Sequence, residues 1–116
     1  MITQKKINIP IFDYKLTIII SDSWEEAKSK LPVQDVDLES SRAVTFSNES
    51  IGGSVVAVLS GCQSSIVHEA VHIKNNIWEY IGYRPQADND EIDAYLVTYI
   101  YEKIMDVYRR HHSLAG

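Results

Sequence analysis

This sequence is poor in cysteine, glycine and proline, and it contains no long apolar run. With Cys62 as its one cysteine, the chain cannot close an internal disulfide, which is typical of proteins from a reducing compartment. The longest strongly apolar stretch, near residues 16–20, is far too short for a transmembrane helix. The N-terminal residues lead into a strand-like segment that contains Asp13, rather than into a signal-peptide core. We therefore expect a cytoplasmic protein without a membrane partner.

Positive charge is also scarce, with 11 Lys and Arg residues against 16 Asp and Glu residues and a formal net charge of −5. Because phosphate backbones are bound by basic surfaces, this balance argues against nucleic acid as a partner. The chain has 116 residues, of which 45% are hydrophobic and 23% charged, as in an ordinary globular protein. This length predicts a single domain over residues 1–116, too small for the two-lobed build of large proteases.

The first half of the chain alternates apolar and polar residues between clusters of turn formers, which predicts β structure. Pro10 suggests an edge strand or a bulge, and residues 48–53 have the composition of a turn that joins two strands as a hairpin. The expected strands cover residues 7–20, 42–47 and 55–59, with a short helix over 24–31 between the first two.

Two long helices are predicted in the second half. The first covers about 66–81 and ends at Gly82, and the second covers 91 to about 111, where His111 and His112 are expected in a frayed helix end. Strands first and helices last predict an α+β fold, in which a small antiparallel sheet of about three or four strands packs on the two C-terminal helices.

The most specific pattern is His68-Glu69-Ala70-Val71-His72, an H-E-x-x-H motif that uses two of the chain's four histidines. Residues four apart lie on one face of a helix, so the two imidazoles are placed to bind one metal ion. Glu69 lies beside them, where it can hold a metal-bound water as a general base. Zinc is the metal expected for this motif on a helix, although Mn, Fe or Co also suit a site of two histidines and a carboxylate.

A catalytic zinc site needs a third protein ligand, and the best candidate is Glu91, nineteen residues after His72 at the start of the second long helix. Asp88, Asp90 and Asp93 are the alternatives. Glu91 would reach the metal if the second helix folds back beside the middle of the first. The competing interpretation is that Asp88 and Glu91 form a capping box at the helix start.

Tyr95 lies one helical turn after Glu91, on the same face of the predicted helix. Its hydroxyl is placed to orient a metal ligand or to donate a hydrogen bond to a developing oxyanion, which would make Tyr95 a catalytic residue. The alternative is a packing role, because this helix is rich in tyrosine.

These residues resemble the gluzincin class of zinc metallopeptidases, including short members found in bacteria and phages. The resemblance covers roughly residues 53–100, with the H-E-x-x-H motif and the later stretch Glu91-Ile92-Asp93-Ala94-Tyr95, in which Tyr95 stands where many members have Asp. It implies a minimal zincin-like fold that binds Zn²⁺ through His68, His72 and Glu91.

The resemblance also implies a metallopeptidase that hydrolyses a peptide bond with a metal-activated water and Glu69 as general base. The substrate would be a peptide or protein in extended form, bound as an added strand along Val55–Leu59. The alternative is a structural or regulatory interaction protein, encoded by a bacterium or phage, that uses the metal for stability and has little general proteolytic activity.

Overall fold

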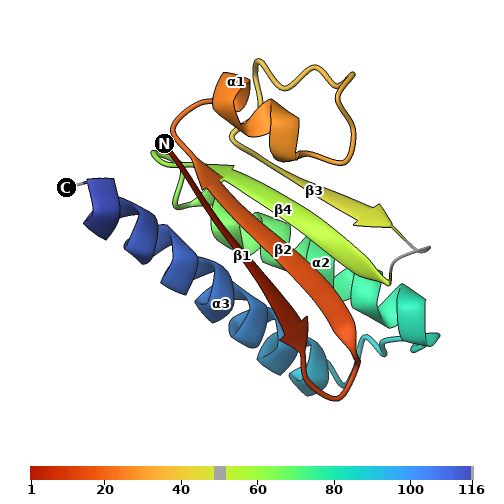
Figure 1. The fold of residues 1–116 in the computed structure, drawn as a ribbon. Coiled ribbons are helices and arrows are strands. Elements are labelled where there is room, and N and C mark those ends of the chain that lie inside the picture. Colours follow the sequence, from red (N-terminus) through yellow and green to blue (C-terminus); the bar gives the residue numbers. More distant parts are fainter. Residues whose placement is uncertain (49–51, 116) are drawn as a thin grey trace.

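The computed structural model describes residues 1–48 and 52–115, and within them four strands form one sheet that two long helices cover on one face (Figure 1). The α+β fold class is therefore confirmed. The strands are β1 (Ile2–Ile9), β2 (Tyr14–Ser21), β3 (Ala43–Asn48) and β4 (Gly53–Leu59). The helices are α1 (Trp24–Ala27), which continues as the 3-10 turn η1 (Lys28–Lys30), α2 (Ser65–Ile81) and α3 (Glu91–Ala115).

The two predicted long helices are confirmed, although α3 extends to Ala115, four residues beyond the predicted end, whereas the first strands differ from the prediction. Gly82 ends α2 in the left-handed conformation, with φ of 77°, and its N–H bonds back to the last turn of the helix. β1 begins at Ile2, five residues earlier than expected. Ile11, expected inside a strand, lies in the β1–β2 turn with a positive φ of 74°. Of the turn predicted over 48–53, residues 49–51 lie outside the described part of the chain.

The sheet is mixed, so the prediction of an antiparallel sheet is wrong for one of its three strand pairs. The strand order is β1-β2-β4-β3; β1 pairs antiparallel with β2 and β3 pairs antiparallel with β4, but β2 and β4 run parallel. After β2 the chain passes through α1 and crosses to the far edge, where it forms β3. β4 then returns between β3 and β2, and this return makes its direction the same as that of β2.

The two central strands are buried on both faces. Ile18 and Ile20 of β2, with Val56 and Val58 of β4, belong to the main core under α2 and α3. The intervening side chains of Ile19 and Ala57 face the opposite side, where they pack with residues around α1 and the segment after it. Continuous apolar runs are what strands covered on both faces require.

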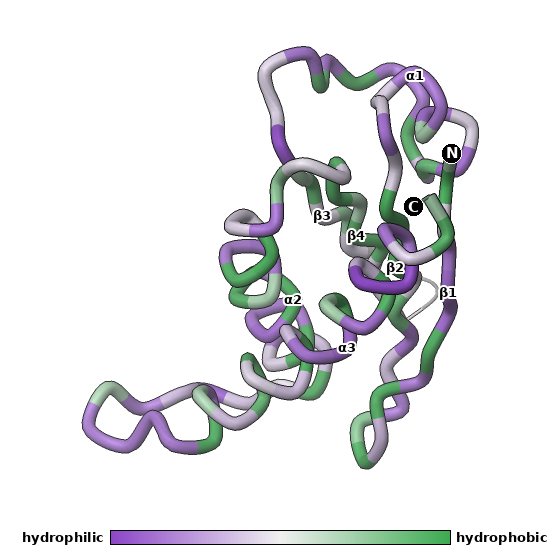
Figure 2. Tube along the Cα trace, turned by 90° about the vertical axis from the view of Figure 1, so that its left-hand side faces the viewer, coloured by the Kyte–Doolittle hydropathy of each residue, from purple (hydrophilic) through white to green (hydrophobic). Residues whose placement is uncertain are grey.

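The two long helices cover different halves of the sheet. α2 contacts β3 and β4, whereas α3 contacts β1 and β2, and both lie on the same side of the sheet in Figure 2. Asp93, near the start of α3, joins the two helices: it accepts a hydrogen bond from Trp78 Nε1 and lies 3.8 Å from Lys74 Nζ. Among the described helices, none combines the length and the apolar character needed to cross a bilayer.

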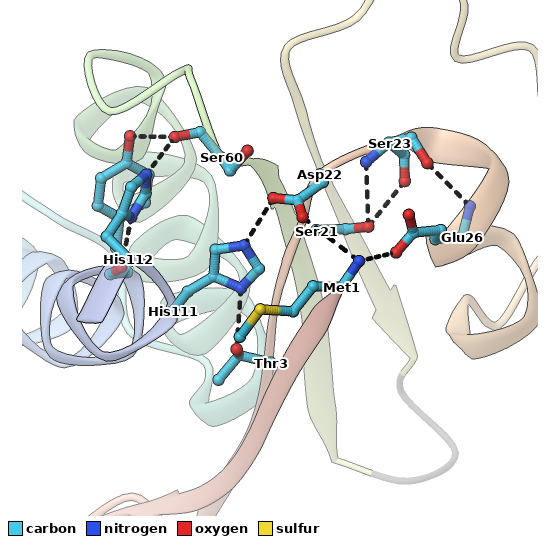
Figure 3. A network of polar contacts seen from close by, with 10 residues as sticks. Met1, Thr3, Ser21, Asp22, Ser23, Glu26, Ser60, His111 and His112 are labelled. Atoms are coloured by element: carbon cyan, nitrogen blue, oxygen red, sulfur yellow. Dashed lines mark hydrogen bonds and ion pairs between the residues drawn. The ribbon is translucent and has the colours of Figure 1, made fainter. Parts of the chain in front are cut away.

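A polar network ties the end of α3 to the first strand (Figure 3). His111 is fully buried; its Nδ1 is hydrogen-bonded to Thr3 Oγ1 of β1 at 2.8 Å, and its Nε2 is 2.8 Å from Asp22 Oδ1. Both ring nitrogens of His112 face backbone carbonyl oxygens, those of Tyr108 and Ser60, at 2.8 and 2.7 Å. The expectation of a frayed helix end at these histidines is therefore wrong, because contacts with β1 and with the chain after β4 hold the last turns of α3 in place.

Candidate functional site

His68 and His72 project from the first half of α2 and point their ring nitrogens at each other. Their Nε2 atoms are 3.1 Å apart, and the rings are 4.7 Å apart between centroids with planes inclined by 74°. Two nitrogens that bind one tetrahedral zinc at about 2.0–2.1 Å are themselves about 3.3 Å apart. The observed pair therefore fits two ligand positions of one tetrahedral metal ion, as the H-E-x-x-H motif predicts.

The same Nε2–Nε2 distance also suits a hydrogen bond, in which one ring donates its N–H to the lone pair of the other. Both arrangements require the two rings to be aimed at a common point. Both side chains are exposed, so that point is accessible from solvent.

Glu69 is turned away from solvent and toward the sheet. Its side chain is only 5% exposed, and its Oε1 accepts a hydrogen bond of 2.7 Å from the hydroxyl of Thr45 in β3. A buried carboxylate needs such a donor, since an ionised carboxylate without a partner is costly to bury. Thr45 thus holds Glu69 between α2 and β3, next to the histidine pair.

These residues line a groove between α2 and β3, made of two adjoining hollows of about 400 and 420 Å³. The two hollows share Ala43, His68 and Glu69, so the motif lies at the middle of the groove. The first hollow extends past Thr45, His72, Ser47 and Asn76, and the second past Arg42, Ser40 and Ser65. The lining is mostly polar and carries few charges, which suits the backbone and polar side chains of a peptide.

β3 is an edge strand of the sheet, and its residues Ala43, Thr45 and Ser47 line this groove. The N–H of Leu59 in β4 donates to the carbonyl of Arg42, just before β3. In an antiparallel pair, every second residue directs its backbone N–H and C=O to the neighbouring strand. The backbone groups of Arg42, Val44 and Phe46 therefore face β4. The N–H and C=O groups of the residues between them, 43, 45 and 47, therefore face the outer edge. A peptide in extended form could add to the sheet there.

The predicted substrate position along Val55–Leu59 is wrong, because both edges of that segment are already paired. β4 pairs with β2 over Gly53–Leu59 on one side and with β3 over Gly53–Val58 on the other. No backbone donors or acceptors of this strand remain for an added peptide. In this sheet, the open edge next to the motif belongs to β3.

Glu91 is not brought to the histidines. Among the residues of 1–48 and 52–115, no group of three or more His, Cys, Asp or Glu side chains is close enough to hold a metal ion. The start of α3 is fixed by the contacts of Asp93 with Lys74 and Trp78. Lys74 is two residues after His72 and therefore points about 200° away from it around the helix. The alternatives Asp88, Asp90 and Asp93 are not grouped with the histidines either.

Tyr95 is also remote from the motif. Its side chain is 72% exposed and lines a separate apolar cavity of about 290 Å³ between the β1–β2 turn and α3, together with Phe12, Trp78 and Ile92. This cavity shares no lining residue with the groove that contains His68 and His72. The arrangement gives Tyr95 no contact with the reacting groups expected at the motif.

Sequence reasoning missed a polar chain at one end of the groove. Asn76 lies one turn after His72, and its amide donates to Ser54 Oγ at 3.3 Å; Ser54 is hydrogen-bonded to the hydroxyl of Tyr14 at 2.6 Å. Burial raises the pKa of Tyr14, so its hydroxyl stays protonated. The i, i+4 spacing from His72 was a signal for Asn76, whereas Ser54 and Tyr14 are joined to it only by the folded sheet.

Comparisons of the chain with family models, with curated proteins and with solved structures gave no match.

Proposed function

We propose that this protein is a metal-dependent hydrolase that cleaves a peptide bond in a substrate bound along the open edge of β3. One observation carries the proposal: the Nε2 atoms of His68 and His72 converge to 3.1 Å in a groove that also contains the carboxylate of Glu69. Metal ligands, a general base and a place for an extended peptide are the parts that such a reaction requires.

The metal proposed for this site is Zn²⁺, held by the Nε2 atoms of His68 and His72. These two imidazoles would be two of the three protein ligands that catalytic zinc sites use. Among the described residues, no group of three potential ligands lies together. When bound, the metal supplies a water activated near neutral pH and polarises a peptide carbonyl. A manganese, iron or cobalt ion in the same place would rest on the same two imidazoles.

Glu69 is the proposed general base and acid. Its Oε1 is engaged by Thr45, which leaves Oε2 to take a proton from the attacking water and to return it to the leaving amine. The low exposure of the carboxylate limits competition from bulk water.

The substrate is proposed to be a peptide or an extended segment of a protein. The outward backbone groups of residues 43, 45 and 47 would pair with it, and the polar lining around Ser47 and Asn76 would contact its side chains. The lone Cys62 supports the further proposal that the protein acts in the cytoplasm.

A Glu69→Gln variant tests this function. We expect it to lose hydrolysis of a fluorogenic peptide library by at least about a hundredfold while it keeps zinc bound, because the amide cannot accept the proton. Glu79→Gln is the matched control, with the same substitution on the same helix at an exposed position. Elemental analysis of protein purified without added metal, beside His72→Ala, measures the zinc. Equal hydrolysis by the wild type and Glu69→Gln would refute the proposal.

A second candidate function is an interaction protein in which the metal serves only stability. The observation that favours it is that, within the described residues, no third His, Cys, Asp or Glu side chain is grouped with His68 and His72 to hold a metal ion. In that case zinc would raise the melting temperature of the wild type and of Glu69→Gln equally, and neither protein would cut any peptide. The same strand edge would then hold a partner rather than a substrate.

A further inference from the structure

Thr45 lies at the centre of β3, and its side chain and its backbone groups point in different directions. Its side-chain hydroxyl donates to Oε1 of Glu69 at 2.7 Å, while its backbone N–H and C=O face the outer edge of the strand. One residue therefore touches both the proposed general base and the line along which a peptide would pair. His68 and His72 lie in the same groove but on α2.

We propose that Thr45 is a positioning residue, which fixes the carboxylate of Glu69 and couples its orientation to the occupancy of the β3 edge. This inference rests on the function proposed above. A glutamate side chain has three rotatable bonds and adopts many rotamers unless a partner selects one. The Thr45 hydroxyl is such a partner, and β-branching restricts its own rotamers in turn.

The geometry assigns different tasks to the two carboxylate oxygens of Glu69. An ionised carboxylate only accepts hydrogen bonds, so the Thr45 hydroxyl must be the donor to Oε1. Oε2 is then the oxygen to which the proposal assigns the proton transfer. Without the hydroxyl, the buried Oε1 would lose its donor, and the side chain would rotate to find water or another donor. The base would remain in the protein but would point elsewhere.

The coupling follows from the position of β3. A peptide paired with the backbone of residues 43, 45 and 47 would make β3 an inner strand and hold it against α2. The distance between Thr45 and Glu69 would then be held as well. A substrate that cannot pair opposite Thr45, such as one N-methylated at that position, is expected to be cleaved at least about tenfold more slowly.

Three variants test the role of Thr45. Thr45→Val removes the hydroxyl at nearly constant shape, Thr45→Ser keeps it, and Thr17→Val makes the first substitution in β2, on the face of the sheet away from the helices. We expect kcat of Thr45→Val to fall about 10- to 100-fold, with KM and zinc affinity within about twofold of the wild type. Thr45→Ser and Thr17→Val should retain kcat within about threefold. Wild-type kcat in Thr45→Val, or equal losses in Thr45→Val and Thr45→Ser, would overturn the inference.

A readout independent of activity separates this inference from the proposed function. Crystal structures of Thr45→Ser and Thr45→Val should show the Glu69 carboxylate in its wild-type position in the first and rotated away in the second. An unmoved carboxylate in Thr45→Val would overturn the positioning role even if the protein hydrolyses peptides. If wild-type protein hydrolyses nothing while Glu69 still rotates in Thr45→Val, the proposed function fails and the positioning role of Thr45 stands.

Discussion

The four histidines of this chain form two pairs, one in the first half of α2 and one near the end of α3, with contrasting surroundings. His68 and His72 are exposed, lie one turn apart and direct their Nε2 atoms at each other. His111 is fully buried between β1 and Asp22, and His112 bonds to two backbone carbonyl oxygens. The nitrogens of the second pair are occupied by the fold itself.

This difference separates a structural histidine from a candidate ligand. A histidine whose ring nitrogens both lie against polar atoms of the protein presents neither nitrogen to a metal from outside, so His111 and His112 hold elements together. A pair whose nitrogens converge at an accessible point is placed to bind something from outside. The residue type alone does not distinguish the two roles; the partners of each nitrogen do.

The largest expected effect on stability comes from His111. We expect His111→Ala to lower the free energy of unfolding by about 3 kcal/mol, because it opens a cavity and removes the partners of Thr3 and Asp22. Urea denaturation measures this, with the exposed Arg110→Ala as control. Zinc affinity should stay unchanged. A loss of zinc binding without a loss of stability would reverse the assignment of the two pairs.

His72→Ala should show the opposite behaviour. We expect zinc affinity, measured by isothermal titration calorimetry, to fall by more than about a hundredfold, since one of the two proposed ligands is lost. The metal-free stability should change by less than about 0.5 kcal/mol, because the side chain is exposed. Asn75→Ala, also exposed on α2, should leave both quantities unchanged.

The contact between His111 and Asp22 should also make the stability of the protein change with pH in the acid range. The hydrogen bond from His111, with a further one from Ser60, lowers the pKa of Asp22 from 3.8 to about 2. Because the folded pKa is depressed, this contribution to stability is complete above about pH 4 and disappears as the pH falls toward 2. Unfolding curves between pH 2 and pH 5 should therefore fall less steeply with acid for Asp22→Asn than for the wild type. Parallel curves for the two proteins would contradict this role of Asp22.

The smallest effect is expected at the start of α3. Glu91→Gln and Tyr95→Phe should leave zinc affinity and hydrolysis within about twofold of the wild type, because neither side chain lies in the histidine groove. Calorimetry and the peptide assay measure both. A tenfold loss of zinc affinity in Glu91→Gln would mean that α3 moves toward His72 when the metal binds.

The outcome for each predicted residue follows from the range of the interaction that places it. The convergence of His68 and His72 depends only on the 3.6-residue period of one helix, so it was predictable from local sequence. Glu91 depended on which face of α2 meets the start of α3. Asp93 contacts Lys74 and Trp78, which lie on a face of α2 turned away from His72, so the start of α3 packs on the other side of the helix from the motif.

The place of Val55–Leu59 in the sheet also depends on contacts far apart in the sequence, although the composition of this segment indicated a central strand. An unbroken apolar run is typical of a strand covered on both faces, which favours a central position in the sheet. The resemblance to known peptidases nevertheless placed the substrate along this segment. Sheet order depends on the crossing after β2, and no residue pattern in residues 31–42 indicates where that crossing leads.

By itself the amino-acid sequence determined the two long helices, the Gly82 terminus and the alignment of two imidazoles and a carboxylate within one stretch of α2, because these depend on neighbours a few residues away. Only the tertiary structure decided that β3 is the open edge, that Thr45 holds Glu69 and that His111 is buried. Those contacts join residues 24 to 108 positions apart, and they form only when the whole sheet has closed on its helices.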